Sequence, residues 1–106
     1  MQIIPVSANS NQTFSILLDG QACTFKIYWR QTRLYLDLLV GDEVIVRGFI
    51  CVNRANILQR VKKGFNGSLH FWDNLGDDFP YYKDLNSRYF LIFMSVDEEL
   101  PEVLKF

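Results

Sequence analysis

The chain is poor in the residues that usually carry catalysis or hold metals. Its 106 residues include one histidine, His70, and two cysteines, Cys23 and Cys51. The cysteines form no CxxC pair and no Cys/His spacing that would bind a metal ion. Both fall within segments that alternate like β-strands, where a free cysteine acts as a small buried hydrophobe. We therefore expect free thiols, no metal, no cofactor and synthesis in a reducing cytoplasm.

Other absences exclude further classes of protein. There is no Gly-rich phosphate loop, no GxSxG and no HExxH, so we expect no enzyme. No apolar run approaches the ~18 residues of a membrane helix, and the opening MQIIPVSANS lacks the basic and apolar regions of a signal peptide. The 11 basic and 12 acidic residues give a net charge of −1 without a basic stripe. We expect neither a membrane location nor dedicated nucleic-acid binding.

Aromatic residues are abundant. Nine Phe, five Tyr and two Trp make up 15% of the chain, within a hydrophobic fraction of 49%. A single domain of this length buries roughly 60–70% of its unfolded surface, and its core is small. Either the core is unusually aromatic, or some of these rings lie at the surface and contact other proteins. The sequence leaves both readings open.

Strand-like alternation dominates the first half of the chain. Two hairpins are predicted, each with a Gly-containing turn, and Gly48 in the last strand indicates a bulge. In that last strand Val44, Val46, Ile50 and Val52 are expected to share one face. The predicted strands and turns are Thr13–Leu18, Asp19-Gly20 and Cys23–Arg30, followed by Leu34–Val40, Gly41-Asp42 and Glu43–Val52.

The second half predicts fewer elements. One short helical turn is expected near residues 54–61, followed by the strand Ser68–Asp73 and a loop over Asn74–Asn86. The strand Arg88–Val96 is apolar on both faces, which indicates a central strand or one covered by a partner.

The fold class is therefore all-β. We expect a small single-domain antiparallel β-barrel or sandwich of six to seven short strands. Residues 1–96 form the β-domain and residues 97–106 an acidic C-terminal extension.

His70 could act as a general base only with an orienting partner and a nucleophile in reach. In the strand Ser68–Asp73 it shares a face with Ser68 and Trp72, which we interpret as the outer face of the sheet. We expect a surface or packed histidine rather than a catalytic one.

The turn after this strand is rich in side-chain oxygens, as a calcium loop is. Its residues are Asp73, Asn74, Gly76, Asp77 and Asp78. The D-x-[DN]-x-[DN]-G spacing of an EF-hand and its closing glutamate are absent. Asp and Asn also stabilise turns through side-chain hydrogen bonds to the backbone. We interpret these residues as turn-forming and expect no metal.

One basic cluster stands out, formed by Arg54, Arg60, Lys62 and Lys63 beside Phe65. Such a cluster can contact phosphates. In a chain of net charge −1 it is more often a solvated face or one half of a charged protein contact. We favour the latter two readings.

Three segments together resemble the baseplate plug proteins of contractile-tailed phages, a family first defined in a cyanophage baseplate. They are QTFSILLDGQACTFKIYW (Gln12–Trp29), LYLDLLVGDEVIVRGFICVNRANIL (Leu34–Leu58) and GSLHFWDNLGDDFPYYKDLNSRYFLIFMS (Gly67–Ser95). The order and spacing of their turn and strand elements carry the likeness. The sequence departs from it at Asn86, where such proteins more often have Gly, and Asn also tolerates the left-handed conformation.

The resemblance implies a non-enzymatic structural component of the virion, located in the tail baseplate. It would contact other tail and hub proteins, in several copies around the tail axis, and would close the tube lumen until DNA release. Apolar segments outside the predicted strands are the candidate interface. These residues are Phe79, Tyr81, Tyr82, Leu100, Val103, Leu104 and Phe106.

Two alternative functions remain. A small β-barrel with Tyr and Trp platforms can bind single-stranded nucleic acid. A small phage-encoded protein can also regulate a host protein. The net charge of −1 counts against the nucleic-acid alternative.

Overall fold

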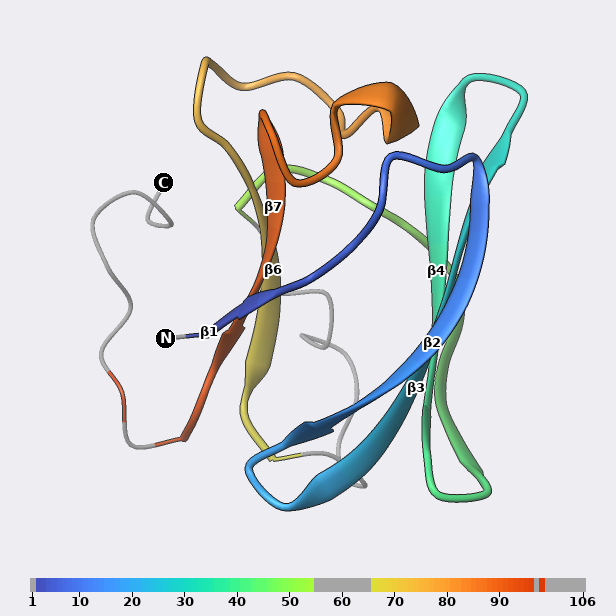
Figure 1. Ribbon diagram of the computed structural model, residues 1–106, viewed down its shortest axis with the longest axis vertical. Coiled ribbons are helices and arrows are strands. Elements are labelled where there is room, and N and C mark those ends of the chain that lie inside the picture. Colours follow the sequence, from blue (N-terminus) through green and yellow to red (C-terminus); the bar gives the residue numbers. More distant parts are fainter. Residues whose placement is uncertain (1, 55–65, 97, 99–106) are drawn as a thin grey trace.

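The computed structural model describes residues 2–54, 66–96 and 98. Its elements are β1 (Gln2–Ile4), β2 (Asn11–Leu18), β3 (Gln21–Arg30), β4 (Arg33–Val40), β5 (Glu43–Ile50), β6 (Ser68–Asp73), the 3₁₀ helix η1 (Tyr82–Asp84) and β7 (Tyr89–Met94). The strands form two antiparallel sheets, ordered β1-β7-β6 and β2-β3-β4-β5. Figure 1 shows the sheets facing each other. The all-β prediction is confirmed, as a sandwich rather than a closed barrel.

The core lies between the two sheets. The four-stranded sheet contributes alternate residues of β3 and β4, and the three-stranded sheet contributes alternate residues of β6 and β7, as expected where one face of each sheet is buried. The fully buried side chains include Phe25, Ile27, Leu36 and Leu38 on one side, and Leu69, Phe71 and Leu91 on the other. Some of the abundant aromatic residues, such as Phe25 and Phe71, therefore lie in the core.

The predicted first hairpin is confirmed. β2 and β3 pair without a break from Leu18↔Gln21 to Asn11↔Tyr28. The two-residue turn places Asp19 at φ 52° and Gly20 at φ 77°, which matches the twist of the flanking strands.

The predicted alternation in β5 is wrong in part. Val46 is buried, but Val44 and Ile50 are exposed, whereas Phe49 packs against the core. The cause is two register shifts against β4, one of them at Gly48, which has φ +67°. Each extra residue moves the following side chains to the opposite face. Gly48 therefore does mark a bulge, as its position in the strand predicts.

The strand β7 occupies the centre of its sheet, between β1 and β6. Leu91 faces the main core, whereas Ile92 and Met94 form a second buried cluster with Trp72 on the opposite face. The predicted burial of both faces is confirmed.

The helical turn expected near residues 54–61 lies, beyond Arg54, outside the described residues. The helix that the structure does describe, η1, falls in the segment we had predicted as a loop. Within the described ranges, no helix has the length and apolar character needed to cross a membrane.

Gly67, just before β6, should not tolerate a side chain. Its φ is +111°, and a Cβ would lie 2.6 Å from both the carbonyl oxygen of Met94 and Cε1 of Phe93. We expect Gly67→Ala to lower the free energy of unfolding by about 3 kcal/mol, measured by urea denaturation. Gly76→Ala is the control, because its nearest neighbour is Nη2 of Arg88 at 3.6 Å, and it should change stability by less than about 0.5 kcal/mol. An equal loss of stability in the two variants would contradict the close approach of Gly67 to Met94 and Phe93.

Candidate functional site

The loop between β6 and β7, residues 74–88, closes one end of the sandwich, and we call it the apical loop. Figure 1 shows it at the top of the view, beside the turn that joins β3 to β4. It begins at the buried end of β6, Asp73, and returns at Arg88. The backbone N–H of Asn74 donates to the carbonyl of Arg88 at 3.0 Å, which fixes the two ends of the loop side by side.

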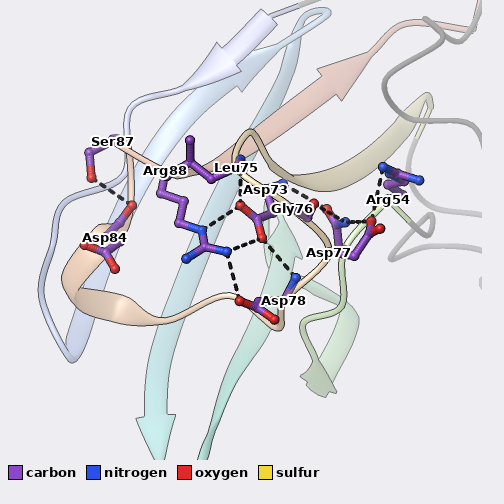
Figure 2. Close-up of polar contacts among 10 residues, drawn as sticks. Arg54, Asp73, Leu75, Gly76, Asp77, Asp78, Asp84, Ser87 and Arg88 are labelled. Atoms are coloured by element: carbon purple, nitrogen blue, oxygen red, sulfur yellow. Dashed lines mark hydrogen bonds and ion pairs between the residues drawn. The ribbon is translucent and has the colours of Figure 1, made fainter.

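The Asp73 carboxylate organises this loop from beneath. Arg88 grips it with two hydrogen bonds, from Nε to Oδ1 at 2.7 Å and from Nη2 to Oδ2 at 2.8 Å. The backbone N–H of Leu75 donates to Oδ1 at 3.0 Å, and that of Asp78 to Oδ2 at 2.9 Å. Figure 2 shows the carboxylate enclosed by these donors. Both oxygens are therefore committed to nitrogen donors, and the predicted role of Asp73 in turn formation is confirmed.

The electrostatics of this group follow from its partners. The Asp73 side chain has no exposed surface, so burial alone would raise its pKa. The hydrogen bonds from Arg88 outweigh burial, and with the two backbone N–H groups they lower the pKa from 3.8 to about 2. The same contact raises the pKa of Arg88. The pair is charged over the whole physiological range.

A second set of contacts ties the crossover after β5 to the apical loop. The Asn53 side chain accepts from the backbone N–H of Asp73 at 2.8 Å and donates to Oδ1 of Asp77 at 2.8 Å. Nη2 of Arg54 lies 3.1 Å from the same Asp77 oxygen. Figure 2 draws this ion pair as a dashed line. Arg54, predicted as part of a solvated or pairing basic face, thus pairs within the chain. The other members of that cluster, residues 60, 62 and 63, and Phe65 lie outside the described residues.

The two tyrosines of the candidate interface pack inward. The ring centroid of Trp29, at the end of β3, lies 5.1 Å from that of Tyr81 and 5.5 Å from that of Tyr82. The two tyrosine rings are 5.0 Å apart at 64°, an edge-on arrangement. Both are half-buried against the core. They hold the apical loop to the four-stranded sheet.

Phe79 and Leu75 remain exposed on the same loop. Phe79 is 48% exposed and Leu75 74%. The guanidinium of Arg33, from β4, lies over the Phe79 ring at 4.1 Å from its centroid, a cation–π geometry. The remaining candidate interface residues, Leu100, Val103, Leu104 and Phe106, lie outside the described residues, so that part of the interface stays a prediction.

His70 is packed rather than exposed. It faces the side of β6 away from the main core, as predicted, and it is only 4% exposed. Of the two expected environments, surface or packed, the structure shows the packed one. Nδ1 lies 2.6 Å from the carbonyl oxygen of Arg54, and Nε2 lies 2.9 Å from Oγ of Ser68. These partners fit a neutral ring that donates from Nδ1 and accepts at Nε2. Burial lowers the pKa of His70, although the Arg54 carbonyl opposes this in part.

Both cysteines are free and buried, as predicted. Burial raises the pKa of the Cys23 thiol and of the Cys51 thiol, so both stay protonated at neutral pH. Among residues 2–54, 66–96 and 98, no three His, Cys, Asp or Glu side chains gather as a metal site would require.

Sequence reasoning missed the two arginines of the site. Arg88 contacts Asp73, and Arg33 contacts Phe79. In each pair the two residues are distant in sequence, and no spacing rule connects them. The bulky exposed Leu75 was also missed, although its place between turn-forming residues was a usable signal.

The described part of the chain is thus an all-β module. At its apex, which we define as Arg33, Leu75 and Phe79, an arginine, a leucine and an aromatic ring lie at the surface. That arrangement is suited to contact with another macromolecule. Residues 1–97 match the family model described as "Cyanophage baseplate Pam3 plug gp18". The chain therefore belongs to the cyanophage baseplate plug family, as the sequence resemblance indicates, and this family is a structural component of the phage baseplate. No curated protein matches the chain.

Removing Arg88 should destabilise the domain strongly, because it leaves the buried Asp73 carboxylate without its cation. We expect Arg88→Met to lower the free energy of unfolding by about 3 kcal/mol at pH 7, measured by urea denaturation. Arg47→Met is the control, since Arg47 is exposed on β5 and its loss should cost less than about 0.5 kcal/mol.

The same pair predicts the acid limit of stability. Because the folded pKa of Asp73 is lowered, its contribution is complete above pH 3.8 and is lost as pH falls through about 2. In Arg88→Met this loss should occur at higher pH. A variant with unchanged stability and acid limit would contradict the account.

Burial of neutral His70 should make the domain less stable in mild acid. Because its folded pKa lies below 6.5, the unfolded chain binds the proton first as pH falls. The free energy of unfolding should therefore be highest above pH 6.5 and decline until pH passes the folded pKa. His70→Asn keeps a donor for the Arg54 carbonyl but does not titrate, so its stability should be flat over this window. An unchanged slope in the variant would show that another group is responsible.

Proposed function

We propose that this chain is a non-enzymatic plug of a phage tail baseplate and acts through protein–protein contacts. The single observation that supports the proposal best is the family match, which covers residues 1–97. The subunit would lie in or on the tail hub, in several copies around the tail axis, and close the tube lumen until DNA release. It would be made in the host cytoplasm and carried in the virion.

The apex is the proposed contact surface. Phe79 and Leu75 are exposed although they are large and apolar, and Arg33 lies against the Phe79 ring. Aromatic and arginine side chains are the residue types that carry most binding energy at protein interfaces. The hydrogen bonds of Asp73 hold the backbone of the loop that carries Leu75 and Phe79. Little conformational entropy is therefore lost when a partner binds to these side chains. Tyr81 and Tyr82 support this surface from behind.

The acidic extension, residues 97–106, is the second proposed contact. Its carboxylates lie at residues 97–99 and 102, and its apolar residues are Leu100, Val103, Leu104 and Phe106. A short segment that combines charged and apolar side chains suits docking on a partner. This part of the proposal follows from the sequence alone.

Binding to the tail proteins of the same phage tests the role. We expect the purified chain to form a stoichiometric complex with a hub or baseplate protein when the two are co-expressed. Phe79→Ser should weaken that complex at least about tenfold, measured by calorimetry. Val44→Ser is the matched control, because Val44 is equally apolar and 43% exposed but lies on β5, away from the apex.

The possible failures are distinguishable. A chain that enters no complex with any tail or hub protein contradicts the baseplate role. A complex that both serine variants form equally well keeps the role but removes the apex as its contact surface.

A further inference from the structure

The outer edge of the four-stranded sheet, formed by β2, has none of the usual protection against pairing with another strand. β2 is eight residues long, pairs with β3 without a bulge, and contains no charged residue and no proline. Natural proteins protect edge strands with charges, prolines, bulges or short length. A long, regular and uncharged edge is a template for another strand.

The other edges of the described sheets differ from β2. β5, at the far edge of the same sheet, has two register shifts and the charged residue Arg47. β1 has three residues. β6 has Asn53 bridged to Phe71, with the N–H of Arg54 donating to the Phe71 carbonyl at 2.6 Å. Within the described ranges, β2 alone offers a full-length unprotected edge.

The free backbone groups of β2 can be assigned. The N–H of Trp29 donates to the carbonyl of Ser10 at 2.8 Å, so the even-numbered residues turn their hydrogen-bonding groups toward β3. The odd-numbered residues Thr13, Ser15 and Leu17 then direct their N–H and C=O groups away from the sheet. No strand of the described residues pairs with that side.

The side chains at this edge are also incompletely covered. Phe14 stacks on Phe25 at 5.4 Å and Ile16 faces the same core, yet both are only half-buried because the sheet ends beside them. Leu17, on the opposite face, is 67% exposed. A further strand would cover both apolar residues on the inner face.

We propose that β2 pairs antiparallel with β2 of a second copy of this chain, which joins the two four-stranded sheets into one. Centring the two-fold axis on Ser15 places Phe14 opposite Ile16 of the second copy, apolar against apolar. It also places Thr13 opposite Leu17 of the second copy, so the pairing stays within the bounds of β2. Because β2 has no charge, self-pairing sets no like charges against each other. The inference uses the fold alone and does not depend on the baseplate role.

A matched pair of lysine variants tests the proposal. Ser15 and Thr24 are directly paired, and their hydroxyl oxygens lie 3.1 Å apart, so Ser15→Lys and Thr24→Lys lose the same contact and add the same charge. Only Ser15 lies on the edge strand, where two lysines would meet across the axis. Sedimentation equilibrium should show the wild type reaching twice the mass of one chain. Ser15→Lys should weaken this association at least about tenfold, and Thr24→Lys less than about threefold.

Amide hydrogen exchange gives a second, residue-level readout on the wild type. The amides of Thr13, Ser15 and Leu17 should become protected as protein concentration rises, while those of Phe14 and Ile16 should be protected throughout. The proposal is overturned if the wild type stays a single chain at roughly 1 mM. It is also overturned if a dimer forms while the odd-numbered amides stay unprotected, or if both lysine variants weaken it equally. If Ser15→Lys fails to fold, the exchange pattern decides.

Discussion

The buried carboxylate of Asp73 is the group on which the shape of the apex depends. A charge removed from water is costly unless hydrogen bonds and an opposite charge replace its hydration. Here Arg88 and the N–H groups of Leu75 and Asp78 supply that replacement. The loop is therefore folded around a charge at its base. The contact between Asp73 and Arg88 thereby fixes the position of the exposed residues of the loop.

The aromatic residues complete the same construction from the other sheet. The ring of Trp29, at the end of β3, contacts the rings of Tyr81 and Tyr82. The apical loop, which follows the three-stranded sheet, is therefore packed against the four-stranded sheet. One end of the sandwich is closed by this contact. Within the described part of the chain, aromatic rings contribute to the core and to this closure, and the ring of Phe79 is exposed. The apical loop is held in place by these contacts, and its helical part is the three-residue 3₁₀ helix η1.

What the sequence could predict follows from the range of each interaction. Period-two alternation and Gly turns are local, so β2, β3 and β4 were predictable, and so was the burial of β7 on both faces. In β5 the bulges shift the register, and alternation alone placed Val44 and Ile50 wrongly. The ion pair of Asp73 with Arg88 joins residues that no local pattern connects, so it emerged only from the three-dimensional structure. The family could be recognised because its turn and strand elements recur in order along the chain.

In the proposed function, the apex of this small domain contacts a partner protein. The most direct test is a cryo-electron microscopy map of baseplates isolated from the phage that encodes this chain. We expect density for the two-sheet domain at the tail hub, with Phe79 and Leu75 buried against a neighbouring baseplate protein. Baseplates that lack the domain, or that hold it with the apex open to solvent, would contradict it.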